Sequence, residues 1–354
     1  LAIGYQALAT MTTGSSNIAI GHNVLDAAAR GETGNIAIGQ DAMSSANEGA
    51  SGLIDNNIAI GTNSLYSGTM SSTDATDGNI AIGYNTMGST TTNPETGTLA
   101  ALTSGIKNTA IGYQAGQAQT TGTENTVIGY DAFKTANLGE SGNVMIGERA
   151  GYLIDNEDCD ENVIIGGAAG HGGTGAMASC VIIGKNAVQY TAANNQTGTI
   201  AIGTSALNAL TSGAANVAVG YQAMDVLTEG SNNTVLGYGA VGALTTGANN
   251  TAIGYQTLDA AAHDEEHNVA IGTGAMGAVM QNELASAGRV AKENVAIGSA
   301  ALQGGTLAEA GTEDLIGNIA IGYEALTTTG VNAHTGTIGI GHSALQALTS
   351  GAGN

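Results

Sequence analysis

The sequence predicts an all-β fold, a repetitive parallel β-solenoid in which short strands stack rung upon rung. Three observations lead to this prediction: a five-residue core recurs eighteen times, successive copies are never closer than 17 residues, and β-branched residues occupy alternate positions within each copy. The whole chain, residues 1–354, is therefore predicted to be one continuous array of eighteen rungs.

Each core consists of Asn, then Ile, Val or Thr, then usually Ala, then Ile and Gly. The final, or core, glycines are Gly4, Gly21, Gly39, Gly61, Gly83, Gly112, Gly129, Gly147, Gly166, Gly184, Gly203, Gly220, Gly237, Gly254, Gly272, Gly298, Gly322 and Gly341. A hard minimum spacing with variable excess indicates a fixed rung that carries surface insertions. The longest insertions are residues 44–56, 66–78, 88–107, 277–293 and 303–317.

The residues before each core glycine predict a buried strand. The Ile directly before the glycine and the β-branched residue two positions earlier share one strand face, and a small Ala occupies the other. Because both faces are apolar, we expect the strand to be buried on both. After the glycine the residue types vary, which indicates solvent. Eight of the eleven tyrosines stand there and are expected mainly to cover the neighbouring rung, with a sugar-binding strip as the alternative.

A second glycine closes many rungs. It lies seven residues before the next core glycine in some copies, as at Gly14 and Gly122, and five before it in others, as at Gly34 and Gly142. This difference predicts two turn geometries. The Asn that opens the core either forms a ladder of stacked amides or caps its own turn. We favour capping, because Thr199 and Thr337 replace Asn in two copies.

Composition narrows the function classes. The chain has 56 Gly, one Pro, one Phe and no Trp, a composition that does not provide the bulky side chains of a thick conventional core. Only 7 basic residues oppose 29 acidic ones, and the net charge of −22 argues against binding nucleic acid. No apolar run is long enough to cross a membrane. With 42% hydrophobic residues, the chain does not have the composition of a disordered protein.

The rung pattern also bears on assembly. A hexapeptide helix would need an aliphatic residue at every sixth position, whereas each rung here has one strongly aliphatic cluster and one weaker Ala-Leu cluster, predicted as two short strands. Such a two-sided rung leaves a flat apolar face that needs a partner. Small residues such as Ala19 and Gly21 would let neighbouring chains approach closely, so a homotrimer is our hypothesis.

The repeat resembles a known family. The run Asn-Ile-Ala-Ile-Gly-Tyr-Glu-Ala-Leu at Asn318–Leu326 is similar to the head repeats of trimeric autotransporter adhesins, and the run at Asn250–Leu258 to phage tail-fibre-like and bacterial surface proteins. The resemblance covers the entire chain. It implies a homotrimeric left-handed parallel β-roll, extracellular on a cell or virion surface, that acts as a fibre shaft or in adhesion. The adhesin heads usually repeat at shorter, more regular intervals.

The two ends of the chain fit one another. Joining Asn354 to Leu1 recreates a core of the form Asn-Leu-Ala-Ile-Gly, at the minimum spacing of 17 residues after Gly341. We therefore expect end-to-end continuation into a longer fibre.

Two acidic segments and two cysteines were weighed as sites. His263–His267 and Asp155–Glu161 contain metal-ligand residue types, but neither has a zinc-protease or EF-hand spacing, so solvated turns are favoured and no metal or cofactor is predicted. Cys159 and Cys180 lie in neighbouring rungs, and whether they are bridged stays open.

The leading functional prediction is a non-enzymatic structural subunit or segment of an extracellular trimeric fibre. One alternative is a phage tail fibre or tailspike segment that binds a receptor or glycan, or that cleaves a glycan with paired carboxylates. Another is a monomeric solenoid that binds ice or another surface through rows of Thr. If a receptor or glycan is bound, the long insertions, above all Thr91–Glu95, are where we expect it.

Overall fold

A computed structural model describes the chain apart from residues 28–30, 45–53, 67–75, 88–103, 137–138, 174, 191–194, 260–264, 278–290, 305–314, 328–333, 349–350 and 354. Its contacts divide it into two compact units, Leu1–Cys180 and Val181–Asn354. Within the described residues both units consist of strands and turns without a helix, which confirms the all-β prediction.

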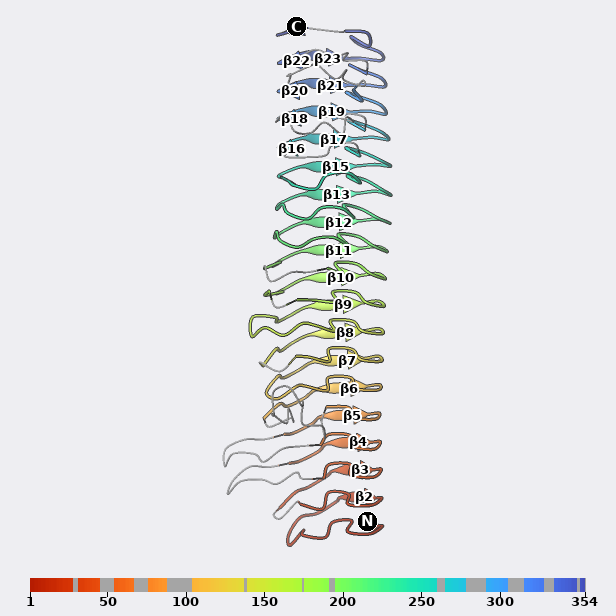
Figure 1. The fold of residues 1–354 in the computed structure, drawn as a ribbon, viewed down its shortest axis with the longest axis vertical. Coiled ribbons are helices and arrows are strands. Elements are labelled where there is room, and N and C mark those ends of the chain that lie inside the picture. The colour runs from red at the N-terminus through yellow and green to blue at the C-terminus, as the bar shows by residue number, and fades with distance from the viewer. Residues whose placement is uncertain are drawn as a thin grey trace. The chain divides into compact units, whose positions relative to one another are not determined.

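Each unit is a stack of parallel strands built from the predicted cores (Figure 1). The strands of the first unit are β1 (Ala2–Ile3), β2 (Ile18–Ile20), β3 (Ile36–Ile38), β4 (Ile58–Ile60), β5 (Ile80–Ile82), β6 (Thr109–Ile111), β7 (Thr126–Ile128), β8 (Val144–Ile146) and β9 (Val163–Ile165). Those of the second are β10 (Val181–Ile183), β11 (Ile200–Ile202), β12 (Val217–Val219), β13 (Thr234–Leu236), β15 (Thr251–Ile253), β17 (Val269–Ile271), β19 (Val295–Ile297), β21 (Ile319–Ile321) and β23 (Ile338–Ile340).

Neighbouring strands pair in register, position for position. Ala110 of β6 pairs with Val127 of β7, for example, although the insertions before the two strands differ in length. The backbone bonds run along the stacking direction: the Ile36 N–H donates to the Asn57 carbonyl at 2.9 Å, and the Gly39 N–H to the Ile20 carbonyl at 2.9 Å. The predicted parallel β-solenoid is therefore present in each unit.

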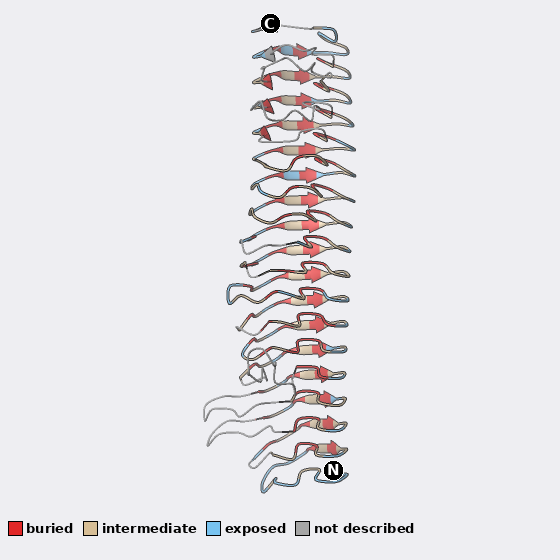
Figure 2. Cartoon of the chain, in the orientation of Figure 1, coloured by how far each residue is buried: buried red, intermediate tan, exposed pale blue. Residues whose placement is uncertain are grey.

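The strands have one buried face, not two. The middle residue, such as Ala19 or Ala201, is fully buried, whereas its neighbours in the strand are half-buried or exposed (Figure 2). Because side chains alternate along a strand, the middle residue points into the solenoid and the flanking residues point outward. The expectation of burial on both faces is wrong for the single chain, since the described residues leave the β-branched columns half-buried or exposed.

The second strand of the rung is not where the Ala-Leu cluster predicted it. That cluster forms turns, whose side chains nonetheless fill the interior, as those of Ala42 and Met43 do. Two-residue strands form instead directly before the Asn turn, in the second unit. They are β14 (Gly247–Ala248), β16 (Glu265–Glu266), β18 (Ala291–Lys292), β20 (Leu315–Ile316), β22 (His334–Thr335) and β24 (Gly351–Ala352).

The turn before the core Asn has a shared geometry. The residue five positions before each core glycine is left-handed whether it is a glycine, as Gly142 at φ +69°, or another residue, as Asn56 at φ +58° and Glu161 at φ +58°. The prediction of two separate geometries is thus wrong at this position. The two groups of copies differ seven residues before the core glycine: Gly14 has φ +134° and Gly213 has φ +126°, whereas Glu32 and Glu140, in copies with the glycine five before, have no positive φ.

The interior of each unit is thin, as the composition predicted. The middle strand residues form a column of mostly Ala, and it faces the Ala-Leu turn, in which Leu25, Leu65 and Phe133 are fully buried. Phe133 is the chain's only phenylalanine. The core therefore consists of small side chains held by backbone bonds to both neighbouring rungs.

The core glycines stack directly on one another. Gly147 has φ +134°, and a Cβ added there would lie 2.6 Å from the Gly166 carbonyl oxygen in the next rung. No L side chain fits such a position without moving backbone, so the recurring glycine is a steric requirement of one-rung stacking.

This requirement predicts that Gly147→Ala destabilises the first unit by about 3 kcal/mol or more, because the clash is with backbone and the φ is unfavourable. The matched control is Gly142→Asn in the same rung, where a Cβ would meet only ordinary contacts at 3.7 Å and where Asn56 already occupies the equivalent position. Denaturant unfolding followed by circular dichroism measures both. Equal losses in the two variants would contradict the stacking argument.

Candidate functional site

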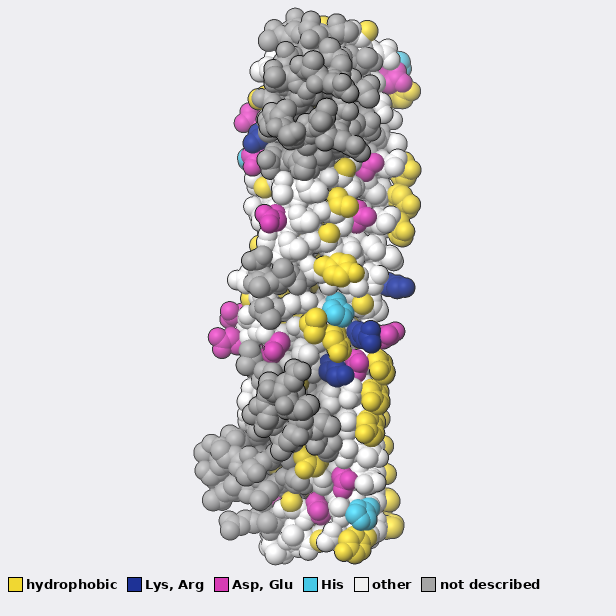
Figure 3. All heavy atoms as spheres, viewed as in Figure 1, with side chains coloured by type: hydrophobic (Ala, Val, Ile, Leu, Met, Phe, Trp, Pro, Cys, Tyr) yellow, Lys and Arg dark blue, Asp and Glu magenta, His cyan; other side chains and the backbone are white. Residues whose placement is uncertain are grey.

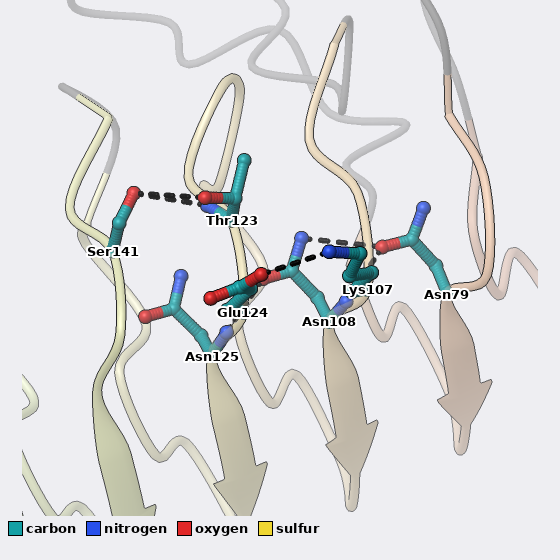
Figure 4. A network of polar contacts seen from close by, with 7 residues as sticks. All are labelled: Asn79, Lys107, Asn108, Thr123, Glu124, Asn125 and Ser141. Carbon is teal, nitrogen blue, oxygen red and sulfur yellow. Dashed lines mark hydrogen bonds and ion pairs between the residues drawn. The ribbon is translucent and has the colours of Figure 1, made fainter.

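A ladder of buried asparagines runs through the first unit. Each side-chain oxygen accepts from the next asparagine: Asn125 Oδ1 takes the Asn143 backbone N–H at 2.9 Å and the Asn143 Nδ2 at 3.2 Å. Each side-chain amide also donates to the carbonyl that begins the next turn, as Asn125 Nδ2 does to Glu140 at 2.8 Å. Figure 4 shows the stacked amides of Asn79, Asn108 and Asn125.

The preference for turn capping is therefore wrong, and the amide ladder is the correct alternative. The partners lie in neighbouring rungs, 14 to 29 residues away, because residues stacked one above another are closer than those across a turn. Thr337 continues the ladder through its backbone N–H, which donates to Asn318 Oδ1 at 3.0 Å. The ladder holds the rungs together, because its side-chain amides bond to neighbouring rungs.

Replacing one asparagine of the ladder should destabilise the first unit. We expect Asn125→Ala to lower the free energy of unfolding by about 2 to 4 kcal/mol, because the buried Asn143 N–H and Glu140 carbonyl lose their partner. Asn56→Ala is the control, since Asn56 is an exposed turn residue and Ala215 adopts the same left-handed conformation. Chemical denaturation compares the two, and a loss as large for Asn56→Ala would argue against the ladder.

The outward strand residues make the main candidate surface. We define the outer face as the first and third residues of each three-residue strand, without the residue after the core glycine. Its exposed members include Ile60 and Ile111 in the first unit and Leu236 and Ile297 in the second, at 36 to 49% exposure. At most of the remaining first and third strand positions, the side chain is a half-buried Ile, Val or Thr. The outer face is thus a set of parallel apolar columns.

Tyrosines line one side of the outer face in two columns. Their rings stack at centroid distances of 5.0 to 5.6 Å, and members of the columns are 42 to 53% exposed. The columns are Tyr84–Tyr113–Tyr130 in the first unit and Tyr221–Tyr238–Tyr255 in the second. Each ring covers its neighbour, as expected. Because sugars stack on ring faces, the alternative of a sugar-binding strip loses support.

Another aromatic stack carries two of the four Lys and Arg residues of the first unit. Lys134 Nζ lies 5.7 Å above the Tyr152 ring and the Arg149 guanidinium 5.8 Å from it, while His171 stacks on Tyr152 at 5.2 Å. Lys134 also pairs with Asp131 at 3.2 Å. Burial, and then the charge of Arg149, lower the pKa of His171, which favours its neutral form.

The threonine rows bear on the ice-binding alternative. The Thr211 hydroxyl donates to the Thr228 carbonyl and the Thr228 hydroxyl to the Thr245 carbonyl, both at 2.9 Å. The Thr327 hydroxyl donates to the Ala300 carbonyl at 3.2 Å. Because these hydroxyls bond to backbone, they are not presented to water as a free row.

The described parts of the two acidic segments do not converge on one point. In Asp155–Glu161, Asp160 accepts from the Ser141 N–H and Asn156 from the Asp158 N–H. In the other segment, Glu266 pairs with Lys292 at 3.0 Å, whereas His263 and Asp264 lie outside the described residues. No group of three or more His, Cys, Asp or Glu side chains that could hold a metal occurs in the described part of the chain.

The two cysteines are free thiols in the interior of the first unit. Cys159 Sγ accepts the Met177 N–H at 3.2 Å, and burial raises the pKa of its thiol to about 11. A protonated, buried thiol is a poor nucleophile. The open question of a bridge is therefore answered by two unbridged side chains that pack as small apolar residues.

The long insertions fall largely beyond what the structure describes. The central parts of 44–56, 66–78, 88–107, 277–293 and 303–317 are among the omitted residues, and so is all of Thr91–Glu95. The prediction that these loops carry recognition stays a prediction. No protein-family model matches the chain, and neither does any curated protein or solved structure. The described residues include no helix able to cross a membrane.

Two half-buried carboxyl groups in the second unit also have shifted pKa values. Burial raises the pKa of Asp225 and of Asp259, and the charge of Asp259 adds to the effect on Asp225. A raised pKa means that the folded state favours the protonated form. The stability this provides is present below the ordinary value of 3.8 and is lost as the pH rises through the folded pKa.

At neutral pH, Asp225→Asn should therefore raise the Tm of the second unit by about 1 to 2 °C, with the effect limited by solvent screening. The difference from the parent should vanish below pH 3.8. Glu293→Gln removes one charge at an exposed turn position and serves as the control. Thermal unfolding across the pH range tests the sign, and a destabilised Asp225→Asn protein at pH 7 would refute it.

Sequence reasoning missed the Lys134–Tyr152–His171 stack, although a signal was present. All three residues lie five positions after a core glycine, Gly129, Gly147 and Gly166 respectively. In an in-register solenoid, equal offsets from the core glycine place side chains in one column. Comparing offsets rather than local motifs would have found it.

Proposed function

We propose that the chain is a non-enzymatic structural segment of an extracellular trimeric fibre, acting as a shaft or in adhesion on a cell or virion surface. The observation that carries the proposal is the outer face, whose apolar columns continue from strand to strand and are left half-buried or exposed by the described residues. Soluble monomers rarely expose contiguous apolar surface of this kind. Three copies packed around a common axis would bury it.

The shape of the outer face suits close packing between copies. Its strand residues are short and β-branched, and Ile and Val at alternating positions have few rotamers to lose on burial. Thr at the first position of β6, β7, β13 and β15 keeps the same shape. A left-handed β-roll trimer, as the resemblance to adhesin heads implies, is the arrangement that we propose.

Charge would act between fibres rather than within one. The chain carries −22, so three copies would carry about −66 (3 × −22), and such fibres would repel one another and anionic membranes. The few described cations are mostly paired locally, as Lys107 with Glu124 at 2.9 Å. Contact with a receptor or glycan would then rest on the long insertions, which is also the basis of the tail-fibre alternative.

Solution mass tests the assembly first. Light scattering should give about 104 kDa, three times 34.7 kDa, or a polymer of such units. A stable particle of 34.7 kDa would refute the trimer and revive the monomeric surface-binding alternative.

A pair of double variants then tests which face is used. Ile202→Gln with Val219→Gln places polar groups on the outer face of β11 and β12, and we expect the trimer to dissociate at higher protein concentration than the parent. Ala209→Gln with Val226→Gln changes half-exposed turn residues of the same two rungs and should leave the mass unchanged. Equal weakening by both pairs would place the interface elsewhere.

A further inference from the structure

We propose that the two tyrosine columns are sites of oxidative dityrosine crosslinking between neighbouring rungs of one chain. The reactive geometry is already present. Tyr113 stacks between Tyr84 and Tyr130, with centroids at 5.4 and 5.2 Å and ring planes 12° and 10° apart. Tyr238 has the same place between Tyr221 and Tyr255, at 5.0 and 5.6 Å.

The columns are open to solvent as well as closely spaced. Figure 3 shows an apolar patch on each unit, level with β5 to β7 in the first unit and with β12 to β15 in the second, as labelled in Figure 1. Tyr113 is 42% exposed and Tyr238 is 53% exposed, so their phenol groups can meet an oxidant and their rings have room to rotate. Parallel strands fix the column spacing at one rung, and the turn backbone is bonded on both sides, as Gln114 N–H is to Tyr84.

Most described side chains that would compete for oxidation are buried, and Met11 is the half-buried exception among the described methionines. The chain has no Trp. Cys159 and Cys180 are buried, and among the described methionines Met43, Met87, Met145, Met224 and Met276 are fully buried. Tyrosine is thus the exposed residue type most readily oxidised by one electron, and six of the eleven tyrosines stand in the two columns.

The chemistry needs an external one-electron oxidant, for which a haem peroxidase with hydrogen peroxide is the class we name. Each of two stacked phenols loses one electron and one proton to become a tyrosyl radical. The radicals couple through a new bond between ring carbons ortho to the hydroxyls, and the hydrogen on each of those carbons moves to oxygen, restoring both phenols. In sum, two tyrosines and one hydrogen peroxide give one dityrosine and two waters.

The product would join consecutive rungs covalently. A bond between Tyr113 and Tyr130 closes a segment of one rung, and one between Tyr84 and Tyr113 closes a rung that carries a long insertion. Closing such segments restricts the unfolded chain, so the oxidised protein should unfold at a higher temperature than the untreated protein. The crosslink requires only one chain and is independent of the proposed trimer.

The decisive test compares two double variants of the full chain treated with peroxidase and hydrogen peroxide. Tyr113→Phe with Tyr238→Phe removes the central phenol hydroxyl of each column, so the central ring can no longer form a tyrosyl radical, and the remaining tyrosines are two rungs, or about 10 Å, apart. Dityrosine fluorescence should fall at least about tenfold, because coupling depends on proximity. Phe retains the stacking, and an unchanged circular dichroism spectrum confirms the fold.

The control removes two tyrosines that are more exposed but lie outside the columns. Tyr5 and Tyr190 are 66% and 61% exposed, so Tyr5→Phe with Tyr190→Phe should leave the yield nearly unchanged if stacking governs coupling. Peptide mapping should show the bonds within 84–113–130 and 221–238–255, and denaturing electrophoresis should show single chains. A greater loss in the control, or bonds mainly between chains, would overturn the proposal.

Discussion

The structure depends on the close approach of consecutive core glycines. Each has a φ between +128° and +151°, and at each glycine that has a core glycine in the next described rung of its unit, a Cβ would meet that neighbour's backbone closer than 3.0 Å. This contact sets both the turn that ends the strand and the one-rung separation. Everything that stacks in a column, whether amide, phenol or aliphatic side chain, takes its spacing from it.

That spacing replaces the thick core of a conventional domain. The buried side chains of a rung are mostly Ala with one Leu, Met, Val or Phe, so they fill little volume. The rung is stabilised instead by backbone hydrogen bonds to the rungs on both sides. The asparagine ladder extends the same principle to side chains, because each amide bonds within the stack rather than to water. Insertions are tolerated because they occur in the connections between strands. The pairing of strand positions, such as Ala110 with Val127, is therefore unchanged.

The same repetition creates surfaces. Alternation along each three-residue strand puts one side chain inside and two outside, so the apolar columns of the outer face follow directly from the strand that builds the interior. Tyrosines at equal offsets from the core glycine become continuous ring stacks for the same reason. We propose that the outer face packs against further copies and that the tyrosine columns can be joined covalently, and both proposals start from the same in-register stacking.

The sequence by itself determined the solenoid: the count of cores, their register, the corner glycines, the small interior and the position of the insertions were all legible in the spacing of residues such as Gly129 and Gly147. The sequence did not determine which way the side chains point or which residues they contact. Whether Ile128 or Val127 faces inward, whether Asn125 bonds across its own turn or to the next rung, and whether Cys159 meets Cys180 depend on which atoms the neighbouring rung brings near. Only the tertiary structure determines these contacts, because stacked rungs bring together residues that are 14 to 29 positions apart in the sequence. No local sequence pattern shows that such residues lie side by side.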